Sequence, residues 1–181
     1  MRRVTNSKGD FGLTVDELRV VARYAAESAQ EALPIFEADR PDDPRARAAI
    51  DAAWVFVHGA PRSRLQRMAS LEAHRAAKDA TRPAAHAAAR AAGDAAAAAY
   101  LHPLAKASQV GHILRAAAFA ARALELVAGG DEEVGAQVME QARLRATPAL
   151  VDVLGRYPPA PEGKNRVDRL WKALDTALRS E

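Results

Sequence analysis

The amino-acid sequence predicts an all-α protein, arranged as a single-domain bundle or a short array of seven to eight helices. Alanine makes up 45 of the 181 residues, and it has the highest intrinsic helix propensity. Valine and isoleucine together number 16 and are too scattered to form strands. Apolar residues instead recur every three or four positions, which is the spacing of one helix face. A chain of this length is expected to form one domain.

The composition excludes several protein classes. The chain has no cysteine, so it has neither a disulfide framework nor a cysteine-based zinc site. Residues 1–11 are polar and lack the apolar segment of a signal peptide, so we expect a cytoplasmic protein. No run of about 20 uncharged apolar residues is present, so we expect no membrane contact. Residues 1–12 are expected to be a flexible tail ahead of a helical domain over 13–181.

The first helix is predicted to begin after Thr14, because Thr14 and Glu17 have the spacing of a capping box. Pro34 is expected to end this helix near residues 32–33, since the residue before a proline avoids the helical conformation. A loop over 35–43, dense in charge and proline, should follow.

The second and third helices are predicted from their start signals. Asp43 and Pro44 have the pattern of an N-cap and a first helical residue, and this helix should end at Gly59. Ser63 opens the third helix, which should end near residues 79–81. The side chains expected to face the core from these two helices are Ala46, Ala49, Ile50, Ala53, Trp54, Val57, Leu65, Met68, Ala69 and Ala76.

The fourth helix is predicted from Pro83 to about Tyr100 and is almost pure alanine. Small side chains let neighbouring helices approach closely, so this helix should lie at the centre of the fold. Pro103 interrupts the helical path. A fifth helix is expected over 104–127 and should end at the glycine pair 129–130.

Three more helices are predicted in the C-terminal part. Asp131, Thr147 and Asn165 each have the position of an N-cap. A stiff proline-rich connection over 158–161 precedes the last helix. Trp171 lies on the apolar face of that helix and should be buried, although the same face would also suit a homodimer.

The net charge of +3 is unevenly spread along the chain. Residues 1–60 carry −2, residues 61–128 carry +6 and residues 129–181 carry −1. A basic middle is typical of a surface for nucleic acid or for an acidic protein. The simpler interpretation is a solvated arginine-rich surface, since the sequence has neither a continuous basic run nor interleaved aromatic residues.

No motif in the chain identifies an enzyme. No histidine has a second histidine three or four residues away, the metal-ligand spacing on one helix. P-loop, G-x-G-x-x-G and G-x-S-x-G sequences are also missing. We therefore predict no catalytic residue, metal or cofactor. Histidines from separate helices could still converge on a metal or ligand, and that alternative stays open.

Two segments carry more charge or polarity than packing requires. Residues 37–47 mix both signs and are expected to be ordered, with Arg45 or Arg47 bonded to one of the acids. Residues 100–112 gather titratable groups around Pro103. With one histidine of the third helix, these segments give the candidate binding residues Glu37, Asp39, Arg40, Asp43, Arg45, Arg47, His74, Tyr100, His102, Lys106 and His112.

Six stretches of the chain share a pattern with a known family. They lie at 13–27, 33–53, 73–78, 91–96, 100–107 and 146–154. Within the second stretch, the segment LPIFEADRPDDPRARAAI depends least on alanine and carries most of the pattern. It resembles small all-helical immunity-like proteins of polymorphic toxin systems, which are common in actinobacteria. The resemblance spans about residues 13–178. Some members are named after the exonuclease subunit SbcC, but this chain has neither an ATPase head nor a long coiled coil.

The resemblance implies a non-catalytic, protein-binding helical module that neutralises a cognate toxin. On this interpretation Glu37 and Asp39 would be recognition surface and Arg47 would be structural. The expected partners are a toxin and, as a further case, a second copy of the chain, but neither nucleic acid nor a membrane. One alternative is a small-molecule or metal-binding helical enzyme that uses residues 100–112. Another is a nucleic-acid-binding helical protein that uses residues 61–128.

Overall fold

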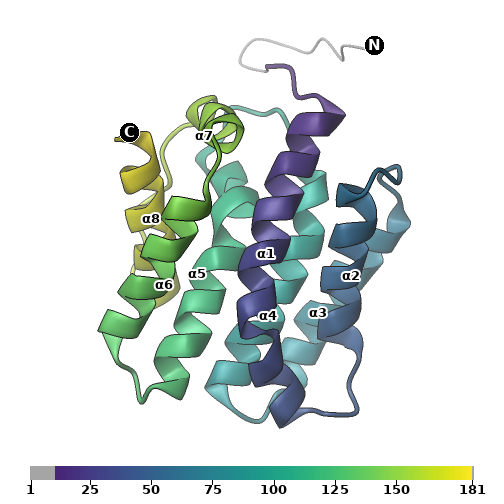
Figure 1. Ribbon diagram of the computed structural model, residues 1–181, viewed down its shortest axis with the longest axis vertical. Helices are drawn as coiled ribbons and strands as arrows, with labels where there is room; N and C mark the ends of the chain where they lie inside the picture. Colours follow the sequence, from purple (N-terminus) through teal and green to yellow (C-terminus); the bar gives the residue numbers. More distant parts are fainter. Residues whose placement is uncertain (1–10, 181) are drawn as a thin grey trace.

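The protein is a bundle of α-helices (Figure 1). Its structure is a computed structural model that describes residues 11–180. No strand occurs in this range, so the all-α prediction is confirmed. None of the helices within it is both long and apolar enough to cross a bilayer. The helices are α1 (Val15–Asp39), α2 (Arg45–Val57), α3 (Arg64–Asp79), α4 (Pro83–Ala97), α5 (Val110–Val127), α6 (Glu132–Arg145), α7 (Pro148–Gly155) and α8 (Arg166–Arg179), with short 3-10 helices η1 (Ala98–Tyr100) and η2 (Ala107–Gln109).

The alanine-rich α4 lies at the centre of the bundle, as predicted. α1, α2, α3 and α5 all pack against it, and α1 lies in front of it in Figure 1. The buried residues of α4 are nine alanines, Gly93 and Asp94. Because α4 also contacts α1 and α2, which are not its sequence neighbours, the fold is a bundle and not an array of stacked repeats.

Most of the predicted helix starts are confirmed by their caps. At α1 and α3 the capping box is complete, because the side chains of Glu17 and Gln66 accept the backbone N–H of the cap residue. α2 begins one residue later than expected, with Pro44 as its N-cap. The residues whose side chains cap a helix are Thr14, Ser63, Asp131, Thr147 and Asn165.

α1 passes through Pro34 and continues to Asp39, so the predicted stop before this proline is wrong. A proline inside a helix removes one hydrogen bond and crowds the preceding turn. The last turn is nevertheless held in place, because Phe36 is fully buried in the core. The connection to α2 is therefore residues 40–44, and not the longer loop predicted over 35–43.

The core-facing side of α3 is predicted only in part: Ala76 is buried and Ala69 packs against the core, as expected. Leu65 and Met68 were expected to be inside, but they are 48% and 42% exposed. Gln66 and Ser70 are buried in their place, together with three alanines. The Nε2 of Gln66 donates to the carbonyl of Ala52 at 3.0 Å, so its buried amide nitrogen has a hydrogen-bond partner. Small residues on the inner face let α3 lie close to α2 and α4.

The fifth helix begins later than expected. Residues 101–106 form an irregular connection around Pro103, and η2 precedes the start of α5 at Val110. The predicted helix start at residue 104 is therefore wrong. The end of the helix is confirmed, since Gly129 and Gly130 follow it with positive φ angles.

The two tryptophans differ in burial. Trp171 is 6% exposed, as predicted, and is therefore part of the core and not a surface for a second copy. Trp54 packs against the core but is less buried than Trp171, so its predicted inward position is confirmed in part. Its Nε1 donates to the Oε1 of Gln30 at 3.1 Å, and its ring stacks on His58 with centroids 5.4 Å apart.

The chain ahead of α1 packs against the C-terminal part of the fold. The predicted tail, residues 1–12, lies outside the described residues except for Phe11 and Gly12. The ring of Phe11 meets Tyr157 edge-on, with centroids 4.7 Å apart. The carbonyl of Gly12 accepts a hydrogen bond from Arg156 at 3.0 Å. These two residues are therefore anchored to the domain.

Candidate functional site

Asp39 joins the end of α1 to the turn between α3 and α4. Its carboxylate accepts the backbone N–H of Thr81 at 2.8 Å, the Thr81 hydroxyl at 2.5 Å and the Nε of Arg82 at 2.9 Å. The hydrogen bond from the Thr81 hydroxyl is the largest of the effects that lower the pKa of Asp39 to about 2. The candidate residue Asp39 therefore holds two connections of the bundle together.

Arg45 and Arg47 are both bonded to acids, which confirms the predicted ordering of this segment. Arg45 lies between Asp43, at 2.6 Å, and Asp79, at 2.7 Å. Its hydrogen bond lowers the pKa of Asp43. The Nε of Arg47 donates to Glu37 at 2.6 Å on a more exposed surface. Arginine–carboxylate pairs of this kind fix geometry as well as charge.

Three of the four acids of this segment, Glu37, Asp39 and Asp43, are thus occupied by partners within the chain, whereas Asp42 is exposed. Arg40 is the C-cap of α1 and lies beside Asp43. A partner that recognised Glu37 would have to displace Arg47. A partner that recognised Asp39 would have to break the hydrogen bonds that this carboxylate accepts from the α3–α4 turn. The geometry therefore favours a structural role for these residues.

The second candidate segment brings its two histidines into electrostatic contact, since burial lowers the pKa of His112 and His102 contributes to this shift, but it does not gather all four candidate residues. The hydroxyl of Tyr100 donates to the carbonyl of Ser63 at 2.6 Å, which fastens the start of α3. His102 and Lys106 have exposed side chains on the irregular connection. His112 is half-buried on α5, and the charge of Arg115, one turn later on the same helix, contributes to its lowered pKa.

Sequence reasoning did not identify the polar cluster that surrounds Asp94. One carboxylate oxygen of Asp94 lies 3.5 Å from the Nε2 of His74, and the other lies 3.8 Å from the Nε of Arg115. Arg90, one turn earlier on α4, lies over the ring of Phe119, 5.1 Å from its centroid. The cluster therefore connects α3, α4 and α5 in the middle of the alanine-rich core.

Burial determines the charges in this cluster. Asp94 is 8% exposed, and burial raises its pKa to about 6 against the opposing effect of Arg115 and Arg90. Burial also lowers the pKa of His74 to about 4, and that of His112 to about 4. At neutral pH the cluster therefore holds one carboxylate, two arginines and two neutral histidines, and it is net positive.

The cluster does not have the geometry of an activated nucleophile. The Nδ1 of His74 has no hydrogen-bond partner, so Ser70, one turn earlier on α3, is not bonded to it. Nucleophilic catalysis needs a hydroxyl in contact with its base. Within residues 11–180, no three His, Asp or Glu side chains come together as a metal site would require. The cluster instead places buried charge, net positive, at the junction of three helices.

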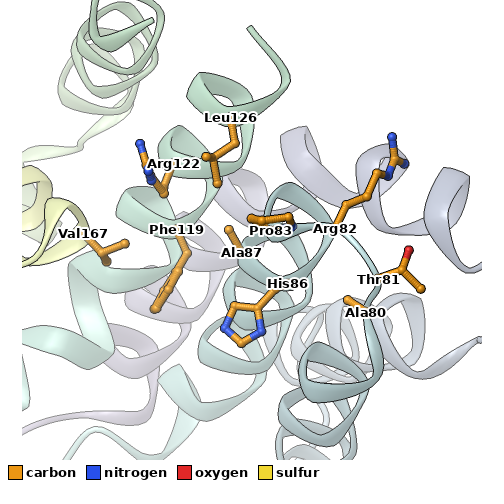
Figure 2. A pocket seen from close by; sticks show the side chains of 10 residues that line it. All are labelled: Ala80, Thr81, Arg82, Pro83, His86, Ala87, Phe119, Arg122, Leu126 and Val167. Atoms are coloured by element: carbon orange, nitrogen blue, oxygen red, sulfur yellow. The ribbon is translucent and has the colours of Figure 1, made fainter. Parts of the chain in front are cut away.

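A shallow pocket of about 500 Å³ lies beside the cluster at the start of α4 (Figure 2). His86 of α4 and Phe119 of α5 both line it. Most of its polar groups are engaged elsewhere. The Nδ1 of His86 lies 2.8 Å from the carbonyl of Ala77, and Arg82 and Arg122 are ion-paired with acids outside the pocket lining. The pocket therefore offers few convergent polar groups for orienting a ligand.

The comparison with known families identifies the class of protein. Residues 13–146 match the model of the family described as Imm-5 like putative immunity protein. This chain belongs to that family. No curated protein and no solved structure matches it. The family suggested by the sequence is thus confirmed for α1 to α6, while α7 and α8 lie beyond the matched residues.

In this Imm-5-like protein, the Asp39 contacts and the Asp94 cluster both lie within the matched region. Part of the cluster has a sequence signal. Arg90 and Asp94, one turn apart, are the charged residues that interrupt a run of alanines. Their partners His74 and Arg115 come from other helices, and nothing in their spacing indicates the contact.

Proposed function

We propose that this Imm-5-like protein is a non-catalytic immunity protein that binds a cognate toxin in the cytoplasm and blocks its activity. The family match over residues 13–146 carries this proposal. The matched part contains α4 and all the helices that pack against it. The toxin would therefore be recognised by the bundle itself.

The bundle has the rigidity that an inhibitor of this kind needs. A preorganised surface loses little conformational entropy on binding, so more of the interaction energy contributes to affinity. Asp39 fixes α1 to the start of α4 through Thr81 and Arg82. The fully buried Glu125 of α5 accepts hydrogen bonds from Arg122 and from Arg166 of α8, each at 3.0 Å. Both contacts limit the relative motion of helices.

The surface charge favours an acidic partner. Residues 61–128 carry +6, and their four acids already have ion-pair partners within the chain. The excess of positive charge is therefore left to attract groups outside the protein. Such a field speeds the encounter with an oppositely charged partner. The four paired acids are Glu72, Asp79, Asp94 and Glu125.

Nucleic-acid binding has only this charge in its favour. Proteins that hold single strands usually stack bases on aromatic rings. Among the described residues, none of the exposed large hydrophobic side chains is a Phe, Tyr or Trp. An enzyme that used residues 100–112 would need those groups to act together, but the Tyr100 hydroxyl is bonded to the start of α3 and Lys106 is exposed.

The proposal is tested with the protein encoded next to this gene. That protein is expressed in a bacterial host, alone or together with this chain. We expect growth to stop in the first case and to be restored in the second, with the two proteins co-purifying. An unrelated alanine-rich helical protein serves as the control for expression load. Growth arrest that persists in the presence of this chain would contradict an immunity function.

A further inference from the structure

The outer face of α3 carries three large apolar side chains among charged ones. Leu65, Met68 and Leu71 are 48%, 42% and 45% exposed, and they are three of the seven large hydrophobic side chains that the described residues expose. Residues three apart are neighbours on a helix surface, so these side chains form one continuous ridge. Single exposed leucines are ordinary, whereas a contiguous apolar patch marks an interaction site.

Packing explains why α3 buries small residues, but not why it exposes large ones. The inner face needs only small side chains and Gln66 to lie close to α2 and α4. Polar residues would serve equally well on the outer face, and they would be more soluble. A place where a protein departs from hydrophobic patterning without a structural gain is typically functional.

Positive charge flanks the ridge. Arg64, Arg67 and Lys78 are exposed, and none of them forms an ion pair with a carboxylate in residues 11–180. The two acids of α3 cannot neutralise them, because Glu72 is paired with Arg75 and Asp79 is paired with Arg45. Most arginines elsewhere in the described chain do have such a partner, for example Arg156 with Glu17 and Arg179 with Asp175.

We infer that the outer face of α3 is the docking surface for an acidic protein, in which apolar side chains pack on the Leu65–Leu71 ridge and carboxylates pair with Arg64, Arg67 and Lys78. The inference rests on the proposed immunity function and names the surface and the chemistry of the partner. An apolar centre with a charged rim is the usual anatomy of a protein interface. The energetic contribution should come mainly from the centre.

Charge argues against two other occupants. A twofold contact between two copies would place α3 against α3, so the unpaired cations of one copy would face those of the other. A nucleic acid would satisfy the cations through its phosphates, but it would leave the aliphatic ridge exposed to water. An acidic protein surface satisfies both features.

The test measures the affinity of this protein for the product of the neighbouring gene by titration calorimetry. Met68→Glu places a carboxylate on the ridge, and Arg67→Glu reverses the charge of its rim. The matched controls are Leu144→Glu on α6, at a leucine that is 61% exposed, and Arg169→Glu on α8, at an exposed arginine that donates to the backbone carbonyl of Lys164 and forms no ion pair with a described carboxylate. We expect at least about tenfold weaker binding for each α3 variant, as for interface hot spots, and unchanged binding for each control.

The outcomes separate this inference from the proposed function. If the wild type binds and both α3 variants bind within about twofold of it, the docking surface is wrong and the immunity function stands. A wild type that neither binds nor protects overturns both. A wild-type dimer that Met68→Glu dissociates would assign the ridge to a second copy. Tight binding of a 30-base-pair DNA duplex that only Arg67→Glu weakens would assign the face to nucleic acid.

Discussion

The ring of His74 lies directly over Gly93 of α4, where a Cβ would stand 2.6 Å from the Cε1 of the histidine. This glycine lets the histidine of α3 approach the α4 backbone and lie within 3.5 Å of Asp94. The same contact buries the imidazole, and burial is the main reason why the pKa of His74 falls to about 4.

Replacing Gly93 with alanine should release this histidine. In Gly93→Ala the new methyl group would push the ring outward, so the pKa of His74 should rise from about 4 toward its ordinary value of 6.5. NMR titration of the His74 ring protons measures this directly. Gly155→Ala is the control, since a Cβ there meets nothing within 4 Å. A pKa for His74 that stays near 4 in Gly93→Ala would show that this close approach does not bury the ring.

Asp94 should make stability depend on pH. The pKa of Asp94 in the folded protein, about 6, lies above its ordinary value of 3.8. Its favourable contribution to the free energy of unfolding is therefore complete below pH 3.8 and is lost as the pH rises through 6. Asparagine does not ionise, so the variant Asp94→Asn does not lose stability in this way as the pH rises. Between pH 4 and pH 7 the variant should gain stability relative to the wild type, by up to about 3 kcal/mol. Urea unfolding of both proteins gives the difference in their free energies of unfolding at each pH. If this difference is the same at pH 4 and pH 7, Asp94 does not have a raised pKa.

The two buried histidines change the pH dependence of stability in the opposite direction to Asp94. The folded pKa values of His74 and His112, each about 4, lie below the ordinary 6.5. Their stabilisation is present above pH 6.5 and is lost as pH falls toward 4. The wild type should therefore show a partly cancelled pH dependence in this window. In Asp94→Asn the histidines act alone, so the unfolding free energy should rise steadily from pH 4 to pH 7.

Asp39 should stabilise the bundle, and its neighbour Asp42 should not. Asp39→Ala removes the hydrogen bonds to Thr81 and Arg82 and should lower the unfolding free energy by about 1–2 kcal/mol. Asp42 is exposed, so Asp42→Ala should change it by less than about 0.5 kcal/mol. Chemical denaturation measures the free energy of unfolding of both variants. Equal losses of stability would show that Asp39 has no special structural role.

The two tryptophans should differ in their contribution to stability. Trp171 lies in the core at 6% exposure, so Trp171→Ala should cost about 3–5 kcal/mol. Trp54 is half-buried and held by Gln30, so Trp54→Ala should cost only about 1–2 kcal/mol. Urea denaturation compares the two losses. A larger loss at Trp54 than at Trp171 would contradict this burial pattern.

The sequence predicted the helices well where local chemistry decides them. The capping residues Thr14, Ser63 and Thr147 act through neighbours three residues away or less, and such signals can be found without knowing the fold. Pro34 shows the limit of this reasoning. A local preference to end the helix was overridden by the tertiary burial of Phe36, which the sequence around the proline does not reveal.

The candidate site was less predictable, because it depends on which helices meet. Periodicity placed Leu65 and Met68 inside, since it ranks side chains by hydrophobicity. The close approach of α3 to alanine-rich neighbours favoured small residues there instead. The Asp94 cluster likewise needs residues from three helices. His74 and His112 were candidate residues from the sequence, but nothing in the chain indicated that they belong to this cluster.

The proposed immunity function requires that this protein binds its toxin and does not modify it. The most direct measurement is a titration of the toxin's activity with purified protein, using the product of the neighbouring gene as the toxin. We predict that inhibition grows in proportion to the amount added, is complete at one equivalent, and is reversed when the two proteins are separated. Complete and lasting inactivation by about one hundredth of an equivalent would contradict this account, because it would require catalytic turnover.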